Sequence, residues 1–376
     1  MRNIGKWVLI GMLGFAAEAG AIDGVVGPGN CNEAGFVSVL NTVDGSGGGT
    51  ITFNCGNAPV TITFTSYKPI SGAVTVDGNN LIIFDGGGSS AFFQIYASAN
   101  ATLKRLTLQH GIFLDVHALE NFGTLSLDRV RVVNNASTES AVVNYGVLDV
   151  AASTFSGNAA SAPPFDGGGA IDNSSGELNI ASSTFNGNSA PSGGAVYSTG
   201  ALTVINSTFS ANSAANGGGA IYQINSGDAV LDFVTIVGNT AQFGAGIYND
   251  GGGSNTMTVG ESIVSANSTG NCDGVIASSG YNLSNDMGCG SAFTGPGDVV
   301  NVALPMQPLG NYGGPTATQP PQAGNPAIDH VPIAQCDAAF DQRGAARPFG
   351  AACDSGSVEV GGVVDDLIFA DGFDGL

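Results

Sequence analysis

The sequence is poor in basic residues. It has nine Lys and Arg against 30 Asp and Glu, which gives a formal net charge of −21 at pH 7. A chain of this charge is repelled by the phosphates of nucleic acids and by anionic membrane surfaces. The one local basic cluster, formed by Lys104, Arg105, Arg129 and Arg131, is more typical of a solvated charged surface than of an anion site. The composition therefore predicts no nucleic-acid partner.

Metal-binding motifs and long apolar runs are also scarce. With three His and no Cys-x-x-Cys motif, the sequence does not indicate a zinc site. The acidic turns leave calcium open as an alternative, but they form no calcium-binding motif, so no cofactor is predicted. After residue 21 no segment is long and apolar enough to span a bilayer. We expect no transmembrane segment in the mature chain, and peripheral attachment to the envelope stays open.

Residues 1–21 have the pattern of a secretory signal peptide. Arg2 and Lys6 precede an apolar stretch at 7–17, and Ala19-Gly20-Ala21 provides small residues for cleavage. The apolar stretch is too short to favour a membrane anchor. This segment predicts export to the extracellular space or the cell surface.

One sequence motif recurs along the middle of the chain: an apolar residue, two small or polar residues, and an asparagine. Successive asparagines are 23, 30, 24, 27 and 28 residues apart. From the second onward, a glycine cluster such as Gly193-Gly194 follows and opens a segment that alternates apolar and polar residues. A period of this size predicts a solenoid of short strands. The asparagines are Asn135, Asn158, Asn188, Asn212, Asn239 and Asn267.

We interpret these repeats as coils of a single-stranded right-handed parallel β-helix over residues 50–290, with about ten coils. Equivalent residues would stack at about 4.8 Å, the spacing of paired strands. Phe155, Phe185 and Phe209 would then form an internal stack, and the asparagine amides would bond to one another and to turn backbone. Helical repeats are disfavoured, because the chain has 59 Gly and little 3.6-residue periodicity.

The two ends of the β-helix need caps, since open strand edges promote aggregation. In residues 22–49, Phe36, Val39, Leu40 and Val43 have the spacing of a short amphipathic helix. Residues 291–362 are proline-rich and lack the repeat, which predicts an irregular cap, and residues 363–376 form an acidic and aromatic tail.

Six cysteines lie outside the repeats, and an even number in an exported chain indicates disulfides. Proximity in the sequence suggests local pairs, although six cysteines allow fifteen connectivities. The pairs suggested in this way are Cys31 with Cys55, Cys272 with Cys289, and Cys336 with Cys353.

The strongest candidates for catalysis are two carboxylates in one predicted column. Glu120 and Asp172 would lie two coils apart, about 9.6 Å, with Val143 between them. An inverting glycosidase uses an acid and a base at such a separation, and a lyase would need an arginine such as Arg129 as base. Ordinary solvated side chains are the competing interpretation of all three residues.

The same column continues as Tyr197, Tyr222 and Tyr248. These tyrosines could form a flat platform on which sugar rings stack. The alternative is that they only stabilise the solenoid.

The repeats resemble those of chlamydial-type polymorphic outer membrane proteins over about residues 118–267. Several later motifs resemble the bacterial choice-of-anchor Q domain. They are S-G-Y-N-L at 279–283, N-Y-G-G-P-T at 311–316, N-P-A-I-D at 325–329 and D-Q-R-G-A-A-R-P at 341–348. Members of that family are exported β-helix proteins, and the tail at 368–373 is similar to one on some exported Gram-negative proteins. The resemblance implies a location outside the cell or at the outer membrane.

These observations lead to two hypotheses. The first is a secreted or surface protein without catalytic activity, which serves adhesion, envelope architecture or binding of an extracellular polysaccharide or protein. The second is a polysaccharide lyase or glycoside hydrolase that uses Glu120 and Asp172.

Overall fold

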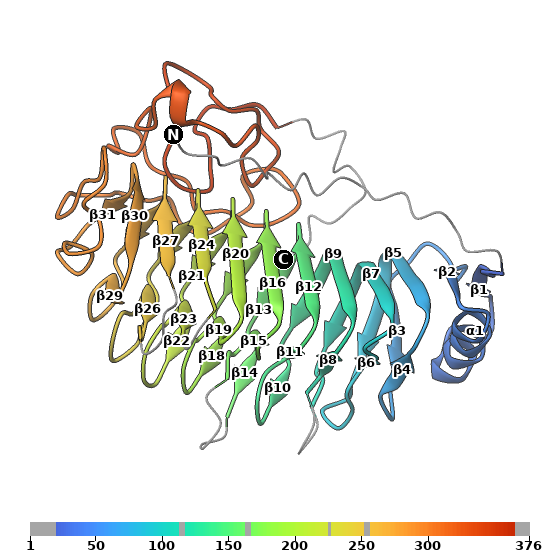
Figure 1. The fold of residues 1–376 in the computed structure, drawn as a ribbon. Helices are drawn as coiled ribbons and strands as arrows, with labels where there is room; N and C mark the ends of the chain where they lie inside the picture. The colour runs from blue at the N-terminus through green and yellow to red at the C-terminus, as the bar shows by residue number, and fades with distance from the viewer. Residues whose placement is uncertain (1–19, 113–116, 162–166, 225–226, 252–255, 365–376) are drawn as a thin grey trace.

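The computed structural model describes residues 20–112, 117–161, 167–224, 227–251 and 256–364. The chain winds into a solenoid of parallel strands, with the helix α1 (Glu33–Gly45) at one end and an irregular C-terminal region, residues 305–364, over the later coils (Figure 1). The predicted parallel β-solenoid is confirmed. The expected signal peptide, apart from its last two residues, and the tail from residue 365 onward lie outside the described residues.

The described strands form three parallel sheets that run along the solenoid axis. The nine-stranded sheet consists of β4 (Lys68–Ile70), β6 (Phe93–Ile95), β8 (Leu119–Asn121), β11 (Val142–Asn144), β15 (Ile171–Asn173), β19 (Val196–Ser198), β23 (Ile221–Gln223), β26 (Ile247–Asn249) and β29 (Cys272–Gly274). The four-stranded sheet consists of β10 (Ala136–Ser137), β14 (Ala159–Ala160), β18 (Ser189–Ala190) and β22 (Ser213–Ala214). Since each coil contributes one strand to the nine-stranded sheet, the described chain has nine coils, close to the ten expected.

The third sheet has 18 strands, because most coils contribute two to it. Its members are β1 (Gly24–Val26), β2 (Gly48–Phe53), β3 (Val60–Thr63), β5 (Ala73–Asp85), β7 (Asn100–Gln109), β9 (Thr124–Val133), β12 (Val147–Ala151), β13 (Thr154–Ser156), β16 (Glu177–Ala181), β17 (Thr184–Asn186), β20 (Ala201–Ile205), β21 (Thr208–Ser210), β24 (Ala229–Asp232), β25 (Thr235–Val237), β27 (Met257–Gly260), β28 (Ile263–Ser265), β30 (Ala277–Gly280) and β31 (Leu283–Ser284).

Each coil bends within the 18-stranded sheet at a residue whose backbone has the left-handed conformation, with a positive φ. In β7 and β9 the bend lies inside one long strand, at Arg105 (φ 51°) and Arg129 (φ 53°). In later coils it separates two shorter strands, as at Ala152 (φ 50°) between β12 and β13. Non-glycine residues rarely adopt this conformation, so its recurrence shows that stacking on neighbouring coils fixes the bend.

Stacked phenylalanines fill the solenoid between β13, β17 and β21. The rings of Phe155 and Phe185 have centroids 4.7 Å apart and planes 6° apart, and Phe185 and Phe209 repeat this with 4.7 Å and 5°. All three side chains are fully buried. The centroid spacing matches the separation of paired strands, so each coil places its ring directly over the ring below.

The six repeat asparagines form a continuous buried ladder along the axis. The Nδ2 group of each donates to Oδ1 of the next at 2.9 Å, and Asn267 extends the series to Asn271 at 2.8 Å. Each Nδ2 also donates to a carbonyl oxygen, as Asn188 does to Phe155 O at 3.0 Å. The ladder therefore pairs amides that burial would otherwise leave without partners.

The corner before each ladder asparagine has a positive φ. Glycine occupies it at Gly157 (65°) and Gly187 (63°), because a residue without Cβ adopts this conformation freely. Asn134 (54°) and Ala211 (55°) show that the corner also tolerates small or polar side chains.

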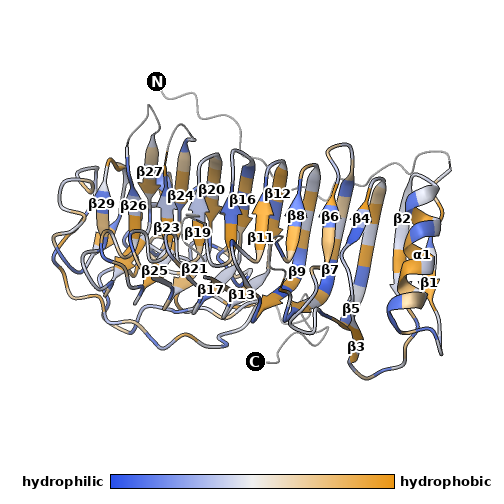
Figure 2. Cartoon of the chain, turned by 90° about the horizontal axis from the view of Figure 1, so that it is seen from below, coloured by the Kyte–Doolittle hydropathy of each residue, from blue (hydrophilic) through white to orange (hydrophobic). Residues whose placement is uncertain are grey.

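The predicted N-terminal helix is confirmed as α1. Its N-cap, Asn32, accepts a hydrogen bond from the Gly35 N–H at 3.0 Å. Phe36, Leu40 and Val43 are buried, and the Phe36 ring lies 5.0 Å from the Phe84 ring inside the solenoid. Figure 2 shows this helix lying across the end of the coils. The helix thus covers the apolar interior at this end.

The C-terminal region does more than close the far end of the solenoid. It packs along the 18-stranded sheet, where the outward-facing Thr184, Thr208 and Thr235 are buried beneath it (Figure 1). Gln342 connects the two parts: its Oε1 accepts from Thr208 Oγ1 at 2.6 Å and its Nε2 donates to Thr184 Oγ1 at 2.9 Å. Ser357 N–H donates to Thr235 Oγ1 at 2.9 Å.

A buried ion pair organises this docked region. Arg347 Nη1 donates to Glu359 Oε2 at 2.9 Å, and both side chains are fully buried. The guanidinium carbon lies 4.4 Å from the centroid of the Phe233 ring, which belongs to a bend of the solenoid. Arg343 donates to Asp341 through Nε at 2.9 Å and through Nη2 at 2.7 Å. The D-Q-R-G-A-A-R-P motif therefore attaches the C-terminal region to the coils.

Three disulfides connect cysteines that are close in the sequence. They are Cys31–Cys55, Cys272–Cys289 and Cys336–Cys353, with Cα separations of 5.9, 4.8 and 6.0 Å. The first joins the N-terminal cap to the first coils, the second closes the last coil, and the third lies within the C-terminal region.

Candidate functional site

The outward face of the nine-stranded sheet carries the candidate column. Parallel pairing aligns Glu120 with Val143 and Val143 with Asp172. The register continues through Tyr197, Tyr222 and Tyr248 and ends at Asp273. Glu120 and Asp172 are therefore two coils apart, as expected from the sequence.

The two carboxylates have different surroundings. Glu120 is half-buried, and its Oε2 accepts from Gln94 Nε2 at 2.8 Å. Asp172 is 8% exposed and accepts from Ser174 Oγ at 2.9 Å. Burial, with a smaller contribution from the charge of Glu139, raises the pKa of Asp172 to about 7. Asp172 can therefore hold a proton at neutral pH.

Arg129 lies in a different sheet from these carboxylates. It is the bend residue of β9 in the 18-stranded sheet, and its Nε is 3.4 Å from Asp128 Oδ1. The structure therefore brings Glu120 and Asp172 onto one face but does not bring Arg129 to it. A lyase that uses Arg129 as base beside Glu120 and Asp172 does not fit this arrangement.

The three tyrosines are adjacent, but their rings do not form the flat platform expected from the sequence. The planes of Tyr197 and Tyr222 are 87° apart at a centroid distance of 5.3 Å, and those of Tyr222 and Tyr248 are 42° apart at 4.8 Å. Tyr197 is also only 8% exposed, so little of its ring could meet a ligand. Edge-to-face packing is a favourable arrangement for aromatic rings, so the rings turn toward one another instead of outward.

A second set of aromatic residues was missed by the sequence analysis. Tyr96, Phe122 and Tyr145 follow β6, β8 and β11, and they are 44%, 38% and 43% exposed. The Phe122 and Tyr145 rings stack at 5.0 Å with planes 9° apart. We call these three residues the aromatic corner. The signal in the sequence is an aromatic residue between an inward asparagine and a glycine, at Asn121-Phe122-Gly123 and again one coil later.

The aromatic corner borders a group of acids. Burial and the negative charges of Asp172, Glu120 and Glu139 raise the pKa of the Tyr145 hydroxyl, which places all three carboxylates within electrostatic range of it. Glu139 Oε2 is 3.1 Å from His117 Nε2. Burial lowers the pKa of His117 to about 4, so the imidazole beside Glu139 is neutral at neutral pH. His117 Nδ1 is buried and has no partner among the residues that the structure describes.

The comparisons with known proteins identify the repeats. Two stretches, residues 182–199 and 206–223, match the Chlamydia polymorphic membrane protein repeat. Searches of curated proteins and of solved structures found no match. Each matched stretch runs from a bend of the 18-stranded sheet to the end of a strand in the nine-stranded sheet, and it includes a ladder asparagine and a column tyrosine. The chain is a β-helix protein in which two coils match this repeat.

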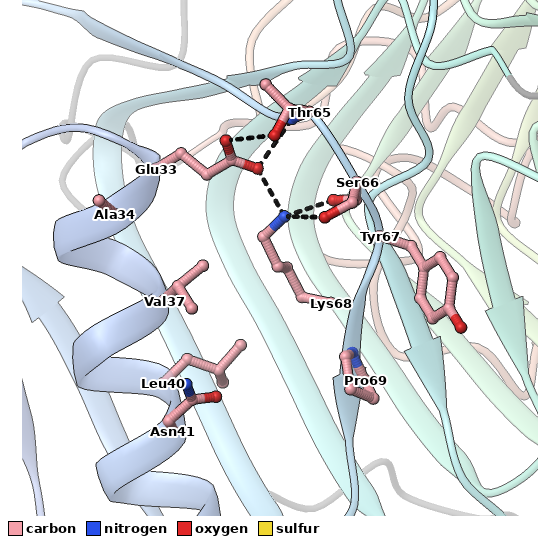
Figure 3. Close-up of a pocket in the computed structure, with 10 residues that line it drawn as sticks. All are labelled: Glu33, Ala34, Val37, Leu40, Asn41, Thr65, Ser66, Tyr67, Lys68 and Pro69. Carbon is pink, nitrogen blue, oxygen red and sulfur yellow. Dashed lines mark hydrogen bonds and ion pairs between the residues drawn. The ribbon is translucent and has the colours of Figure 1, made fainter.

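A pocket outside these repeats lies between α1 and β4 (Figure 3). Lys68 Nζ donates to Glu33 Oε1 at 2.6 Å and to Ser66 Oγ at 3.2 Å, and Glu33 also accepts from the Thr65 N–H at 2.8 Å. β4 pairs with β6 on one edge only, through the backbone groups of Lys68 and Ile70. Pro69 lies between these residues, and because proline has no N–H, it places no unpaired donor on the open edge of β4. Glu33, Thr65, Ser66 and Lys68 therefore bond to one another, and these contacts attach the cap to the first coils.

The described residues include no helix long and apolar enough to cross a membrane. Within the same residues, His, Cys, Asp and Glu side chains form no group of three or more that could hold a metal ion.

We expect Asp172→Asn to change how stability depends on pH. An aspartate carboxyl in the unfolded chain has a pKa near 3.8, and folding raises the pKa of Asp172 to about 7. Between pH about 4 and about 7 this carboxyl is therefore ionised in the unfolded chain but still protonated in the folded chain. The contribution of Asp172 to stability therefore falls over this range and stays low above it. The free energy of unfolding of Asp172→Asn should exceed that of the parent by a margin that grows between pH 4 and 7, as measured by urea unfolding.

Proposed function

We propose that the protein is an exported, surface-located β-helix without catalytic activity, and that it binds an extracellular polysaccharide. The single observation that carries the proposal is the combination of the aromatic corner with the polar column on one outward face. Aromatic faces and edges bind the C–H surfaces of sugars, and neighbouring carboxylates and amides accept or donate hydrogen bonds to hydroxyl groups. Gln94, Glu120 and Tyr145 supply these groups within adjacent coils.

Location at the cell surface or outer membrane is supported by three features of the chain. The repeat match is to a family described as a membrane protein of Chlamydia. The resemblance of the C-terminal motifs to the choice-of-anchor Q domain also favours an exported protein, as does the signal-peptide pattern of residues 1–21.

Hydrolysis of a polysaccharide is the second candidate function. It is favoured by Asp172, whose raised pKa would allow it to act as a general acid at neutral pH. Glu120, two coils away at about 9.6 Å, would act as the base. The burial of Asp172 and its hydrogen bond from Ser174 count against this role, because a general acid must reach the glycosidic oxygen.

The test is incubation of the disulfide-bonded protein with a panel of neutral, acidic and basic polysaccharides. Retained protein, new reducing ends and unsaturated products are measured in the same samples. We expect retention on at least one polymer without release of reducing ends, and about tenfold weaker retention for Tyr145→Ala. Release of reducing ends that is lost in both Glu120→Gln and Asp172→Asn would replace the binding function by hydrolysis. Absence of both retention and products would refute both candidates.

A further inference from the structure

The aromatic corner and its acids differ from a general sugar-binding surface in their charge. Glu120, Glu139 and Asp172 come from adjacent coils, and strand register places Glu120 and Asp172 in the column beside the aromatic corner. In the described part of the chain, Lys104, Arg105, Arg129 and Arg131 belong to the 18-stranded sheet, and the basic residue of the nine-stranded sheet, Lys68, is buried and paired with Glu33. The face beside the aromatic corner is therefore strongly negative, within a chain that is itself acidic.

Exposed rings and carboxylates together favour a cation that also has an apolar surface. A ring face attracts an ammonium group through its quadrupole, and a carboxylate forms a charge-assisted hydrogen bond with the same group. Phe122 and Tyr145 offer stacked rings at the rim of the acidic group. A uronic acid polymer would be repelled here, and a neutral polymer would leave the carboxylates without a charged partner.

The acids differ in how much of each carboxylate a ligand can reach. Glu120 and Asp172 lie on the same column two coils apart, about 9.6 Å, and Val143 separates them with an apolar surface. Asp172 is only 8% exposed, whereas Glu120 and Glu139 are half-buried, so a bound ammonium group can reach Glu120 and Glu139. The imidazole of His117 lies beside these acids. Its Nε2 is 3.1 Å from Glu139 Oε2, and its buried Nδ1 has no partner among the described residues.

We propose that the aromatic corner, together with Glu120 and Glu139, binds a polysaccharide of amino sugars whose nitrogens are free and protonated. This inference rests on the proposed glycan-binding function and names its ligand class. The rings stack on the sugars, the carboxylates bind the ammonium groups, and selectivity arises because N-acetylation removes the charge that the acids recognise.

The experiment compares two probes of equal length, a glucosamine hexamer and an N-acetylglucosamine hexamer, by calorimetry at low ionic strength. The disulfide-bonded full chain should bind the glucosamine hexamer at least about tenfold more tightly. Glu120→Gln should remove most of this preference, while Glu177→Gln, which deletes one negative charge from the 18-stranded sheet, should keep it. Tyr145→Ala should weaken binding of both hexamers about tenfold, and Tyr67→Ala, at an exposed tyrosine beside α1, should leave both unchanged.

The outcomes separate this inference from the proposed function. Equal affinity for the two hexamers, equal losses in Glu120→Gln and Glu177→Gln, or equally tight binding of a lysine hexamer would overturn the ligand class. If neither hexamer binds but another polysaccharide of the panel is retained, the inference is wrong and the proposed function stands. If the panel retains no protein, both are wrong. Circular dichroism of each variant verifies that a loss of binding does not reflect a loss of folding.

Discussion

Replacing Arg347 by alanine is expected to lower the free energy of unfolding by about 3–5 kcal/mol. Its guanidinium donates to Glu359 Oε2 at 2.9 Å, to Asp354 O at 2.8 Å and to Gly356 O at 2.7 Å, and it lies over the Phe233 ring. The substitution leaves the Glu359 carboxylate buried without its counter-charge, which costs far more than an exposed pair would lose. Urea unfolding, with hydrogen exchange to locate the destabilised part, measures the effect.

Lys104→Ala is the matched control for this prediction. Lys104 Nζ is 3.4 Å from Asp77 Oδ2, but its side chain is about one-third exposed, so its loss should cost less than about 1 kcal/mol. Equal losses in the two variants would contradict the structural role assigned to Arg347. Exchange should also increase first in the C-terminal region and in the threonines beneath it, because these are the groups that the buried pair holds in place.

Asn188→Ala is expected to cost about 3 kcal/mol or more, because it interrupts the asparagine ladder at its centre. The Asn188 Oδ1 accepts from both N–H and Nδ2 of Asn158, and its Nδ2 donates to Asn212 Oδ1 and Phe155 O. Alanine leaves the N–H of Asn158 and one hydrogen of its Nδ2 group buried without partners, and Phe155 O loses the donor that Asn188 supplied. Each such group carries a desolvation penalty of about 1–3 kcal/mol.

Asn186 provides the control for the ladder, since it lies two residues earlier in the same coil and faces outward. Asn186→Ala should change the free energy of unfolding by less than about 0.5 kcal/mol. Asn188→Asp, which buries a carboxylate without a counter-charge and turns one of its oxygens toward Phe155 O and Asn212 Oδ1, should cost at least as much as Asn188→Ala at neutral pH. Similar values for all three variants would mean that the ladder does not contribute to stability.

The local repeat made the solenoid predictable from the sequence. Once the repeat period is known, it determines which residues of successive coils stack. The alignment of Phe155 with Phe185, and the position of Glu120 two coils from Asp172, therefore follow from the sequence spacing alone. The helix α1 was predictable for the same reason, because its apolar positions recur within one short segment. Where neighbours in space are set by a fixed period, composition and spacing determine the contacts.

Features that depend on contacts across long separations could not be predicted. Thr184, Thr208 and Thr235 look like ordinary outward-facing strand residues, and nothing near them in the sequence indicates that residues more than a hundred positions later bury them. Likewise, the angle between the Tyr197 and Tyr222 rings depends on how each ring packs against its neighbours, which a column of identical residues does not specify. The aromatic corner was overlooked because it lies one residue outside the strands that carry the column.

The C-terminal region has a mechanical consequence for a protein stretched along its axis. In a bare solenoid, a pull from the two ends loads the contacts between coils in series, so the weakest contact separates first. Here the docked region forms hydrogen bonds with five successive coils, at Ser182, Asn206, Thr235, Glu261 and Tyr281. It therefore carries part of an axial load in parallel with the contacts between those coils. None of these hydrogen bonds reaches the described coils before Ser182. Those coils therefore form the more extensible half of the molecule, and the coils covered by the C-terminal region form the more rigid half.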